Sequence, residues 1–191
     1  MFLEQFPESG QKIGWIEVIC GSMFSGKTEE LIRRMRRAQF AKQKLVIFKS
    51  GLDKRYAEEE VVSHKGESIP AMQVNSANEI LTNWSNELVV GIDEAQFFDQ
   101  NLVEVCTTLA SKGVRVIVAG LDMDYTGKPF GPIPNLLAVA EYVTKVHAIC
   151  LSCGNLAQFS HRKTNNSEQV MLGAVDEYEP FCRDCFNKNK K

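Results

Sequence analysis

The sequence has no apolar run that approaches the ~20 residues of a membrane-spanning helix. Its opening, MFLEQFPESG, has no basic start followed by an apolar stretch, so we expect neither a signal peptide nor an anchor. Charge of one sign is also not in excess: 22 Lys and Arg face 24 Asp and Glu, which leaves no general basic field for nucleic acid. Fixed-period repeats and low-complexity tracts are missing as well. These absences predict a cytoplasmic protein that acts on neither membranes nor nucleic acid.

The chain has 191 residues, of which 44% are hydrophobic and 24% charged. This length and composition are sufficient for one modest domain and a small appended unit. A chain of this length removes roughly 70% of its unfolded surface from water, so it can build a core without covalent crosslinks. In the cytoplasm its six cysteines are expected to be thiols or metal ligands rather than disulfides.

Apolar runs alternate with amphipathic segments up to about residue 142. The apolar runs are 14–20, 44–49, 87–93 and 114–120. Because they lack polar alternation, they predict parallel strands that are covered on both faces. Helical spacing predicts a helix over 28–41, a second around 102–109 and a short third over 77–84. In the first helix we expect one buried stripe, and a solvated face made by Arg33, Arg34, Arg36 and Arg37.

The pattern changes after Tyr142, where short segments, paired cysteines and the polar stretch HRKTNNSEQ follow. The chain therefore predicts an α/β domain over 1–142, with a mostly parallel sheet and helices on both faces. A second, metal-organised unit is expected over 143–191, and the final KNKK is expected to be a solvated tail.

A phosphate loop is predicted where the first strand meets the first helix. The matching residues of the pattern G-x-x-x-x-G-K-[ST] are Gly21, Ser22, Met23, Phe24, Ser25, Gly26, Lys27 and Thr28. Backbone N–H groups of such a loop surround an anion beside the positive end of a helix. Lys27 would reach the outer phosphates, and the Thr28 hydroxyl can bind Mg²⁺. The alternative is a plain glycine turn, but sequence and context together favour a P-loop NTPase-like fold.

Two neighbouring acids, Asp93 and Glu94, end the apolar run at 87–93. Ligands collect at the carboxyl ends of parallel strands, so we expect both acids beside the phosphate loop. Since neighbouring side chains leave an extended strand in opposite directions, we expect separate roles. Asp93 would hold Mg²⁺, and Glu94 would take or orient a proton. A solvent-facing strand end is the alternative interpretation.

Two short-spaced cysteine pairs near the end of the chain predict a tetrahedral zinc site with four thiolates. Its ligands would be Cys150, Cys153, Cys182 and Cys185. Four protein ligands leave no open position, so the role is structural. A redox dithiol or buried thiols are the alternatives, although redox pairs usually occur singly near a βαβ start.

The remaining cysteines and the histidines carry no such pattern. Cys20 and Cys106 fall within strand and helix patterns and are expected in the core. His64, His147 and His161 are not spaced with a cysteine or an acid as a ligand would be.

The motifs GSMFSGKT, DEAQFF, GLDMDYTGKPFG and the paired C-x-x-C units, in this order, resemble the type II thymidine kinases, small zinc-containing enzymes. The similarity extends from about Trp15 to Cys185. Within the family, the chain resembles the cellular enzymes, and among them the bacterial ones. The resemblance implies transfer of the γ-phosphoryl group of ATP to the 5′-hydroxyl of thymidine, and also of deoxyuridine. It further implies Mg²⁺, one structural Zn²⁺, a homotetramer and feedback inhibition by dTTP.

The resemblance also implies roles for single residues. Glu94, Lys27 and Arg55 would be catalytic, and Asp93, Glu94, Ala95 and Gln96 would join the phosphate loop in contacting ATP and Mg²⁺. The residues expected around the nucleoside are Met23, Asp53, Phe97, Leu121, Tyr125, Phe130, Ser160, Gln169, Val170, Met171, Leu172, Gly173 and Tyr178. Of these, 169–173 match a lasso whose backbone binds the base and whose ends the zinc site would fix.

Four of the aromatic and hydroxyl positions need a further comment. Tyr125 and Ser160 stand where other members have Phe or Thr, so discrimination against deoxyuridine stays open. Phe98 is expected in the core, because it neighbours Phe97 on an extended segment. Phe130, within GKPFGPIP, is expected to line a cleft from a loop.

Two other functions share some of these motifs. A P-loop ATPase or switch whose zinc ribbon binds a macromolecule would have the same loop and acids, but the near-neutral charge disfavours nucleic acid. A nonenzymatic zinc-ribbon interaction protein would leave Lys27, Thr28 and Glu94 without a task. Thymidine-dependent turnover of ATP separates these functions from a kinase.

Overall fold

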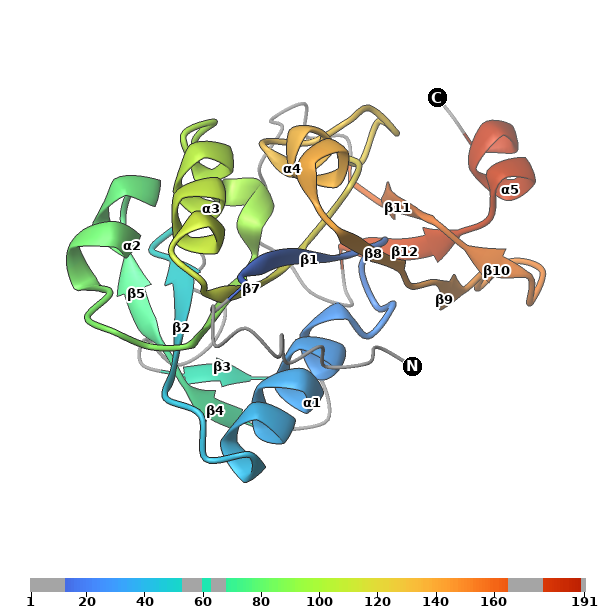
Figure 1. Ribbon diagram of the computed structural model, residues 1–191. Helices are drawn as coiled ribbons and strands as arrows, with labels where there is room; N and C mark the ends of the chain where they lie inside the picture. Colours follow the sequence, from blue (N-terminus) through green and yellow to red (C-terminus); the bar gives the residue numbers. More distant parts are fainter. Residues whose placement is uncertain (1–12, 53–59, 63–67, 165–176, 190–191) are drawn as a thin grey trace.

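The main element of the fold is a six-stranded parallel sheet. The computed structural model describes residues 13–52, 60–62, 68–164 and 177–189 (Figure 1). The strand order is β5-β2-β6-β7-β1-β8, and every neighbouring pair is parallel. The strands are β1 (Trp15–Cys20), β2 (Leu45–Ser50), β5 (Met72–Val74), β6 (Val89–Asp93), β7 (Arg115–Gly120) and β8 (Tyr142–Lys145). The prediction of parallel strands is therefore confirmed.

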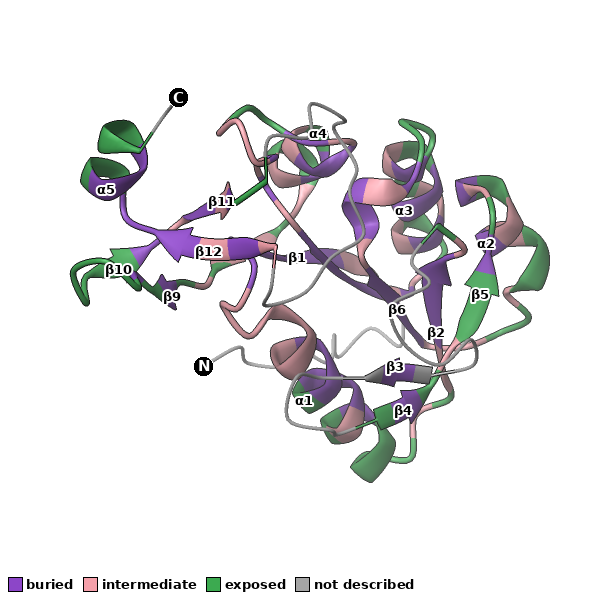
Figure 2. Ribbon diagram, turned by 180° about the vertical axis from the view of Figure 1, so that it is seen from behind, coloured by how far each residue is buried: buried purple, intermediate pink, exposed green. Residues whose placement is uncertain are grey.

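Helices cover both faces of the sheet, as expected (Figure 1). On one face lie α2 (Ala77–Asn83), α3 (Leu102–Ser111) and α4 (Ile133–Val139). On the other lie α1 (Lys27–Phe40) and the antiparallel pair of β3 (Glu60–Val62) and β4 (Ser68–Pro70). Figure 2 shows the central strands buried along their length, which agrees with their continuous apolar sequence.

The residues of α1 and β6 explain their close approach. The buried stripe of α1 is Leu31, Ile32, Met35 and Ala38, the residues expected from helical spacing. Gly91 lies opposite, and a Cβ atom there would come within 3.1 Å of the Met35 sulfur. The glycine thus lets α1 pack directly against the middle of the sheet.

The expected solvated arginine face is wrong for Arg34, which is 3% exposed. Its Nη1 atom donates to Glu17 Oε2 at 2.6 Å, and its Nη2 atom donates to Thr144 Oγ1 at 2.9 Å. Glu30 accepts from its Nε atom at 2.8 Å. The second oxygen of Glu17 accepts from Arg115 Nε at 2.6 Å. Periodicity could not reveal this ion-pair network, because its acid comes from the middle of an apolar strand.

A smaller unit follows β8. It contains the pairs β9 (Ala148–Ile149) with β10 (Leu156–Ala157) and β11 (Phe159–Arg162) with β12 (Tyr178–Phe181), and then α5 (Arg183–Lys188). Its buried residues form a separate cluster, the C-terminal core, made of Ala148, Cys150, Ala157, Phe159, Phe181, Cys182, Cys185 and Phe186. The strand β8 crosses the boundary expected at residue 142, and the division into two domains stays a prediction.

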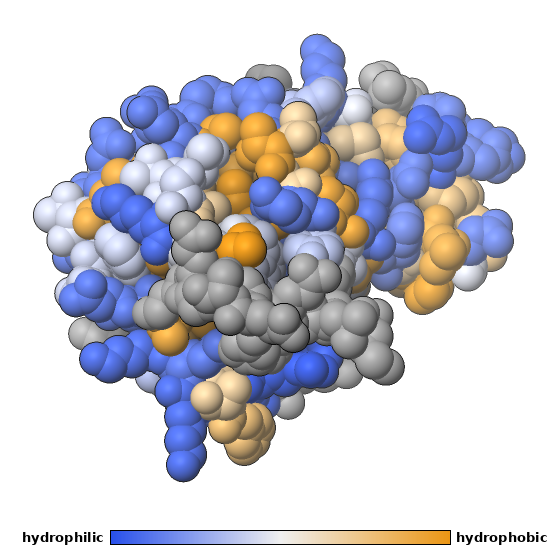
Figure 3. Space-filling view, viewed as in Figure 1, coloured by the Kyte–Doolittle hydropathy of each residue, from blue (hydrophilic) through white to orange (hydrophobic). Residues whose placement is uncertain are grey.

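Hydrophilic residues cover much of the outline of the molecule in Figure 3. Apolar side chains gather over β9 and β10, where Ile149, Leu151 and Leu156 are exposed. Among the described residues, we find no helix with the length and apolar character to cross a membrane.

Candidate active site

The predicted phosphate loop, residues 21–28, connects β1 to α1. Gly26 has a left-handed backbone (φ 85°) directly before the helix, a conformation that suits glycine. At Gly21 a Cβ atom would lie 2.2 Å from the Val146 carbonyl oxygen, so a side chain is excluded. Both glycines of the motif are therefore required by the backbone.

Side chains of the loop are already directed at its interior. Lys27 Nζ donates to the Ser22 carbonyl at 2.8 Å, and Ser25 Oγ donates to the same oxygen at 2.7 Å. The Lys27 ammonium group thus lies over the loop at the N-terminus of α1. An anion bound there would meet a full positive charge and the positive end of the helix dipole.

Asp93 lies at the carboxyl end of β6 and contacts the loop. Thr28 Oγ1 donates to its Oδ2 atom at 3.2 Å. Burial and the neighbouring charge of Glu94 raise the pKa of Asp93 to about 7, while the charge of Lys27 lowers it. The hydrogen bond between Thr28 and Asp93 brings the phosphate loop and the acidic pair into one site. Thr28 and Asp93 are oxygen ligands of the kind that Mg²⁺ prefers.

Glu94 follows the strand but does not continue it. Its backbone is left-handed (φ 50°), and the 3₁₀-helix η1 (Ala95–Phe97) starts at the next residue. We expected the side chains of Asp93 and Glu94 to diverge because both residues would lie on an extended strand. This reason is wrong, because the Glu94 backbone is not extended. A left-handed glutamate costs free energy, and such residues often occur at functional sites.

Gln96 holds the Glu94 side chain in place. Its Nε2 atom donates to Glu94 Oε2, and its Oε1 atom accepts from the Leu121 N–H at 2.9 Å. Gln96 is 2% exposed, and a Cβ atom at Gly131 would lie 2.3 Å from the Gln96 carbonyl oxygen. Gln96 thus bridges the ends of β6 and β7, and Ala95 beside it is buried in the core.

The aromatic candidates form two groups. The rings of Phe97 and Phe130 meet edge to face, with 6.1 Å between their centroids. Tyr125 and Tyr178 are joined by Arg162, whose guanidinium lies 3.7 Å from the centroid of the Tyr125 ring and donates to the Tyr178 hydroxyl at 2.7 Å. Arg162 is buried and was missed by the sequence analysis, because it lies inside a stretch that looked uniformly polar.

Phe98 packs in the core as expected, and it is 6% exposed. Phe130 is 8% exposed but does not belong to the large clusters of the sheet. It contacts Phe97 from the loop before α4, and its role in lining a cleft stays a prediction. Leu121, at the end of β7, is half-buried next to Gln96.

Ser160 contacts the phosphate loop. Its hydroxyl accepts a hydrogen bond of 2.9 Å from the backbone N–H of Met23, across 137 positions of sequence. The side chain is 4% exposed. Met23 and Ser160, two of the residues expected around the nucleoside, are thus brought together at the loop.

Some candidates cannot be placed. Asp53, Arg55 and the lasso residues 169–173, as well as His64, lie outside the described residues. The roles of Asp53, Arg55 and residues 169–173 stay predictions from the resemblance.

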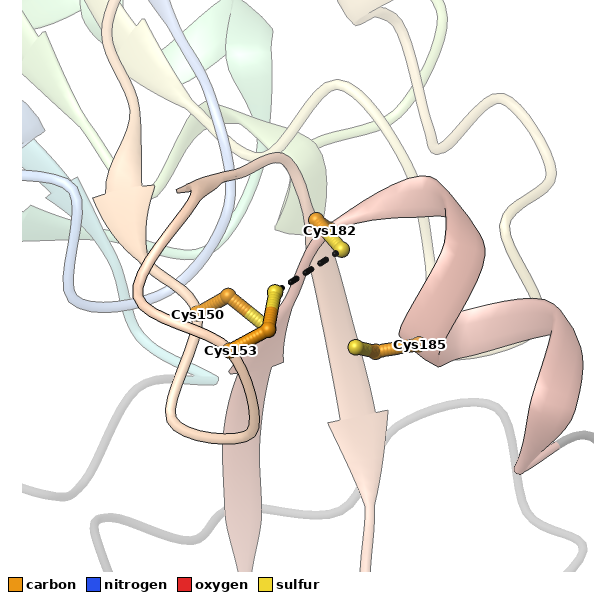
Figure 4. A group of neighbouring side chains, drawn as sticks. All are labelled: Cys150, Cys153, Cys182 and Cys185. Atoms are coloured by element: carbon orange, nitrogen blue, oxygen red, sulfur yellow. Dashed lines mark hydrogen bonds between the residues drawn. The ribbon is translucent and has the colours of Figure 1, made fainter.

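The four paired cysteines come together in the C-terminal unit (Figure 4). Cys150 and Cys153 lie in the turn between β9 and β10, and Cys182 and Cys185 lie at the start of α5. Their sulfur atoms all lie within 4.8 Å of one another, and those of Cys153 and Cys182 are 3.6 Å apart. Tetrahedral zinc, with Zn–S bonds of about 2.3 Å, needs sulfur atoms about 3.8 Å apart. The donor set therefore fits Zn²⁺ with small adjustments.

The other cysteines are core residues, as predicted. Burial raises the pKa of Cys106 to about 12, and burial together with the charge of Asp122 raises that of Cys20 to about 11. Both thiols are thus protonated and inert at neutral pH. His161 stacks on Phe181, with 4.8 Å between the ring centroids, which is a packing role.

Comparison with known proteins gives one consistent result. The sequence model of a family described as "Thymidine kinase" matches residues 14–186. A thymidine kinase of Bacteroides thetaiotaomicron is 58% identical over 186 residues, covering 97% of this chain and 94% of that protein. One of Rhodothermus sp. is 59% identical over 177 residues, covering 93% and 83%, respectively. One of Bacteroides fragilis is 57% identical over 188 residues, covering 98% and 94%.

Proposed function

The chain belongs to the thymidine kinase family, and we propose that it transfers the γ-phosphoryl group of ATP to the 5′-hydroxyl of thymidine in nucleoside salvage. The products are dTMP and ADP. The observation that carries this proposal is the hydrogen bond of 3.2 Å from Thr28 in the phosphate loop to Asp93, the residue next to Glu94 at the end of β6. A phosphate cradle and a proton acceptor in one site are what phosphoryl transfer to a hydroxyl requires.

The phosphate donor would bind in the loop at residues 21–28. Backbone N–H groups of the loop and the N-terminus of α1 face its β- and γ-phosphates, and Lys27 exchanges its hydrogen bond with Ser22 for one with a phosphate oxygen. Thr28 and Asp93 would hold Mg²⁺, which when bound neutralises part of the charge on the triphosphate.

Glu94 would act as the proton acceptor. In the reaction, the bond between the γ-phosphorus and its bridging oxygen breaks, a bond from the 5′-oxygen forms, and the hydroxyl proton goes to the Glu94 carboxylate. Gln96 donates to one carboxylate oxygen and so fixes the orientation in which the Glu94 carboxylate would meet the hydroxyl. Because the transition state is loose, orientation of this carboxylate matters more than strong basicity.

The nucleoside would lie against the aromatic residues beside Glu94. Phe97 and Phe130 would form one side of the site, and the rings of Tyr125 and Tyr178, joined by Arg162, would form another. A flat pyrimidine with a methyl group suits such walls. Asp53 and Arg55, and the backbone of residues 169–173, are proposed to bind the sugar, the phosphates and the base edge, with deoxyuridine as a second substrate.

The cysteine cluster would hold one structural Zn²⁺, bound through Cys150, Cys153, Cys182 and Cys185. In this role the metal links the turn between β9 and β10 to the start of α5. Both β11 and β12, which flank the lasso segment in sequence, are thereby held together at one end.

Three further properties belong to the proposal. We place the enzyme in the cytoplasm, where its six cysteines, none of which forms a disulfide in the structure, stay reduced. We expect a homotetramer, and a molar mass measured by light scattering after size-exclusion chromatography would test this expectation. We also expect dTTP to inhibit the enzyme, because it carries both a thymine and a triphosphate.

The test is an assay of ADP and nucleoside monophosphate formation with ATP and, in turn, thymidine, deoxyuridine, deoxycytidine or no nucleoside. A thymidine kinase forms ADP rapidly with thymidine, more slowly or similarly with deoxyuridine, and hardly at all without a nucleoside. ADP formation that is equally fast without nucleoside would support a P-loop ATPase instead. A chain that binds no ATP would support the interaction-protein alternative.

A further inference from the structure

The middle of the phosphate loop touches the C-terminal unit at two points. The first is the hydrogen bond of 2.9 Å from the Met23 N–H to Ser160 Oγ in β11. Both partners are buried, so water does not compete for this bond. The hydroxyl of a strand in the C-terminal unit thus fixes the direction of one loop N–H group.

The second point is Phe24, the next residue of the loop. Its ring packs against the C-terminal core, which includes the metal ligands Cys150, Cys182 and Cys185. Its backbone is left-handed (φ 62°), which is unfavourable for a residue with a bulky side chain. Such a conformation persists only where the surroundings fix it, and here the surroundings include the C-terminal core.

The two ends of the loop are held beside the parallel sheet instead, where Val146 packs against the core under α1. Gly21 lies against the backbone of Val146, whose N–H donates to the Cys20 carbonyl at 2.9 Å. Lys27 and Thr28 belong to the first turn of α1, which packs on the sheet. Different parts of one anion site are therefore positioned by different units of the protein.

We propose that the C-terminal unit shapes the triphosphate site, with Phe24 and Ser160 as positioning residues that make ATP binding depend on an intact cysteine cluster. The inference rests on the proposed function, and it deepens it: the zinc unit then serves the phosphate donor in addition to the nucleoside. When zinc is lost, the C-terminal core loosens, Phe24 and the Met23 backbone lose their supports, and the loop no longer keeps the shape that surrounds the phosphates.

The experiment measures binding of Mg·ADP by calorimetry to the full-length, zinc-loaded protein, with zinc content determined for each sample. Phe24→Ala and Ser160→Ala should each weaken binding about tenfold while zinc content stays at the wild-type value. Ser160→Thr keeps the hydroxyl and should restore binding. Phe40→Ala, at the exposed far end of α1, and Ser111→Ala, on the exposed side of α3, are matched controls that should bind as the wild type does.

Phe24→Gly separates the ring from the backbone strain. Glycine adopts the left-handed conformation freely, so this variant removes the contact with the C-terminal core but also the strain. We expect the same weakening as in Phe24→Ala. Wild-type affinity in Phe24→Gly would show that the core does not position the loop, and would overturn the proposal.

Removal of zinc provides the second arm. Stripping the metal from the wild type with a zinc-selective chelator should weaken Mg·ADP binding at least as much as Phe24→Gly does. Stripping the double variant Phe24→Gly/Ser160→Ala should add little, because both contacts are already cut. Unchanged affinity in the stripped wild type, or fully additive losses, would contradict the proposal.

These readouts do not depend on nucleoside phosphorylation. If the zinc-loaded variants bind Mg·ADP as the wild type does while thymidine is phosphorylated, the inference fails and the proposed function stands. If the coupling is found but no nucleoside is phosphorylated, the proposed function fails and the coupling stands. Steady-state kinetics add a check: in Phe24→Ala the KM for ATP should rise more than kcat falls.

Discussion

Replacing Glu17 by Gln should destabilise the protein strongly, because Glu17 is the centre of the buried ion-pair network. Its carboxylate is 1% exposed and accepts from Arg34, Arg115 and Trp15 at 2.6, 2.6 and 2.8 Å. Breaking a buried pair by removing one charge costs about 3 to 5 kcal/mol, since the remaining charges stay buried without compensation. With an unfolding entropy of about 2.1 cal/mol/K per residue, this lowers the Tm by about 8 to 12 °C.

The pH dependence of this effect gives a second readout. Burial alone would raise the pKa of Glu17, but the hydrogen bond and charge of Arg115, with the Trp15 N–H and the charge of Arg34, hold it below its ordinary value. A lowered pKa stabilises the fold above the pKa of the unfolded chain, and this contribution is lost as the pH falls through the folded pKa. The difference between wild type and Glu17→Gln should therefore be large at pH 7 and shrink below about pH 4.

The assay is chemical and thermal unfolding between pH 3 and 8, with Glu104→Gln as the control. Glu104 lies exposed on α3, so its replacement should change the Tm by less than about 2 °C at every pH. A Tm of Glu17→Gln within that range at pH 7, or a difference that grows towards acid pH, would refute the reasoning.

Three further changes test the site. Lys27→Ala should raise the KM for ATP at least about tenfold, because the phosphates lose a charged partner; unchanged ATP dependence would argue against the phosphate loop. Gln96→Leu should lower kcat about 10- to 100-fold with little change in the KM for ATP, since Glu94 loses its support; normal turnover would exclude the positioning role. Cys153→Ser should lower zinc content, measured by mass spectrometry, and the Tm by several degrees; full retention of the metal would contradict the four-thiolate site.

Much of the fold follows from local pattern. Continuous apolar runs predicted parallel strands, and the spacing of Leu31, Ile32, Met35 and Ala38 predicted the buried side of α1. These predictions succeed because burial on both faces or on one stripe leaves a direct trace in the sequence. The clustering of the four cysteines could be predicted for the same reason, because two short-spaced pairs are the sequence pattern typical of a tetrahedral metal site.

The failures concern contacts between distant residues. Arg34 looked solvated because its partner, Glu17, lies 17 positions earlier in the preceding strand, beyond the phosphate loop. Arg162 looked like part of a polar tail because Tyr125 and Tyr178 reach it from separate segments. The left-handed backbone of Glu94 is set by η1 and Gln96, and no local rule favours it in a glutamate. The position of a motif could be predicted, but not the partners that the fold assigns to it.

The most direct test of the account compares dTMP formation in a single turnover by the wild type, Glu94→Gln and the control Glu104→Gln, with ATP and thymidine both saturating. The account predicts that Glu94→Gln still binds thymidine and Mg·ATP but forms dTMP at least about 100-fold more slowly, because the amide cannot take the hydroxyl proton. Glu104→Gln should react as the wild type does. A wild-type rate in Glu94→Gln would remove this carboxylate from the reaction and contradict the central claim.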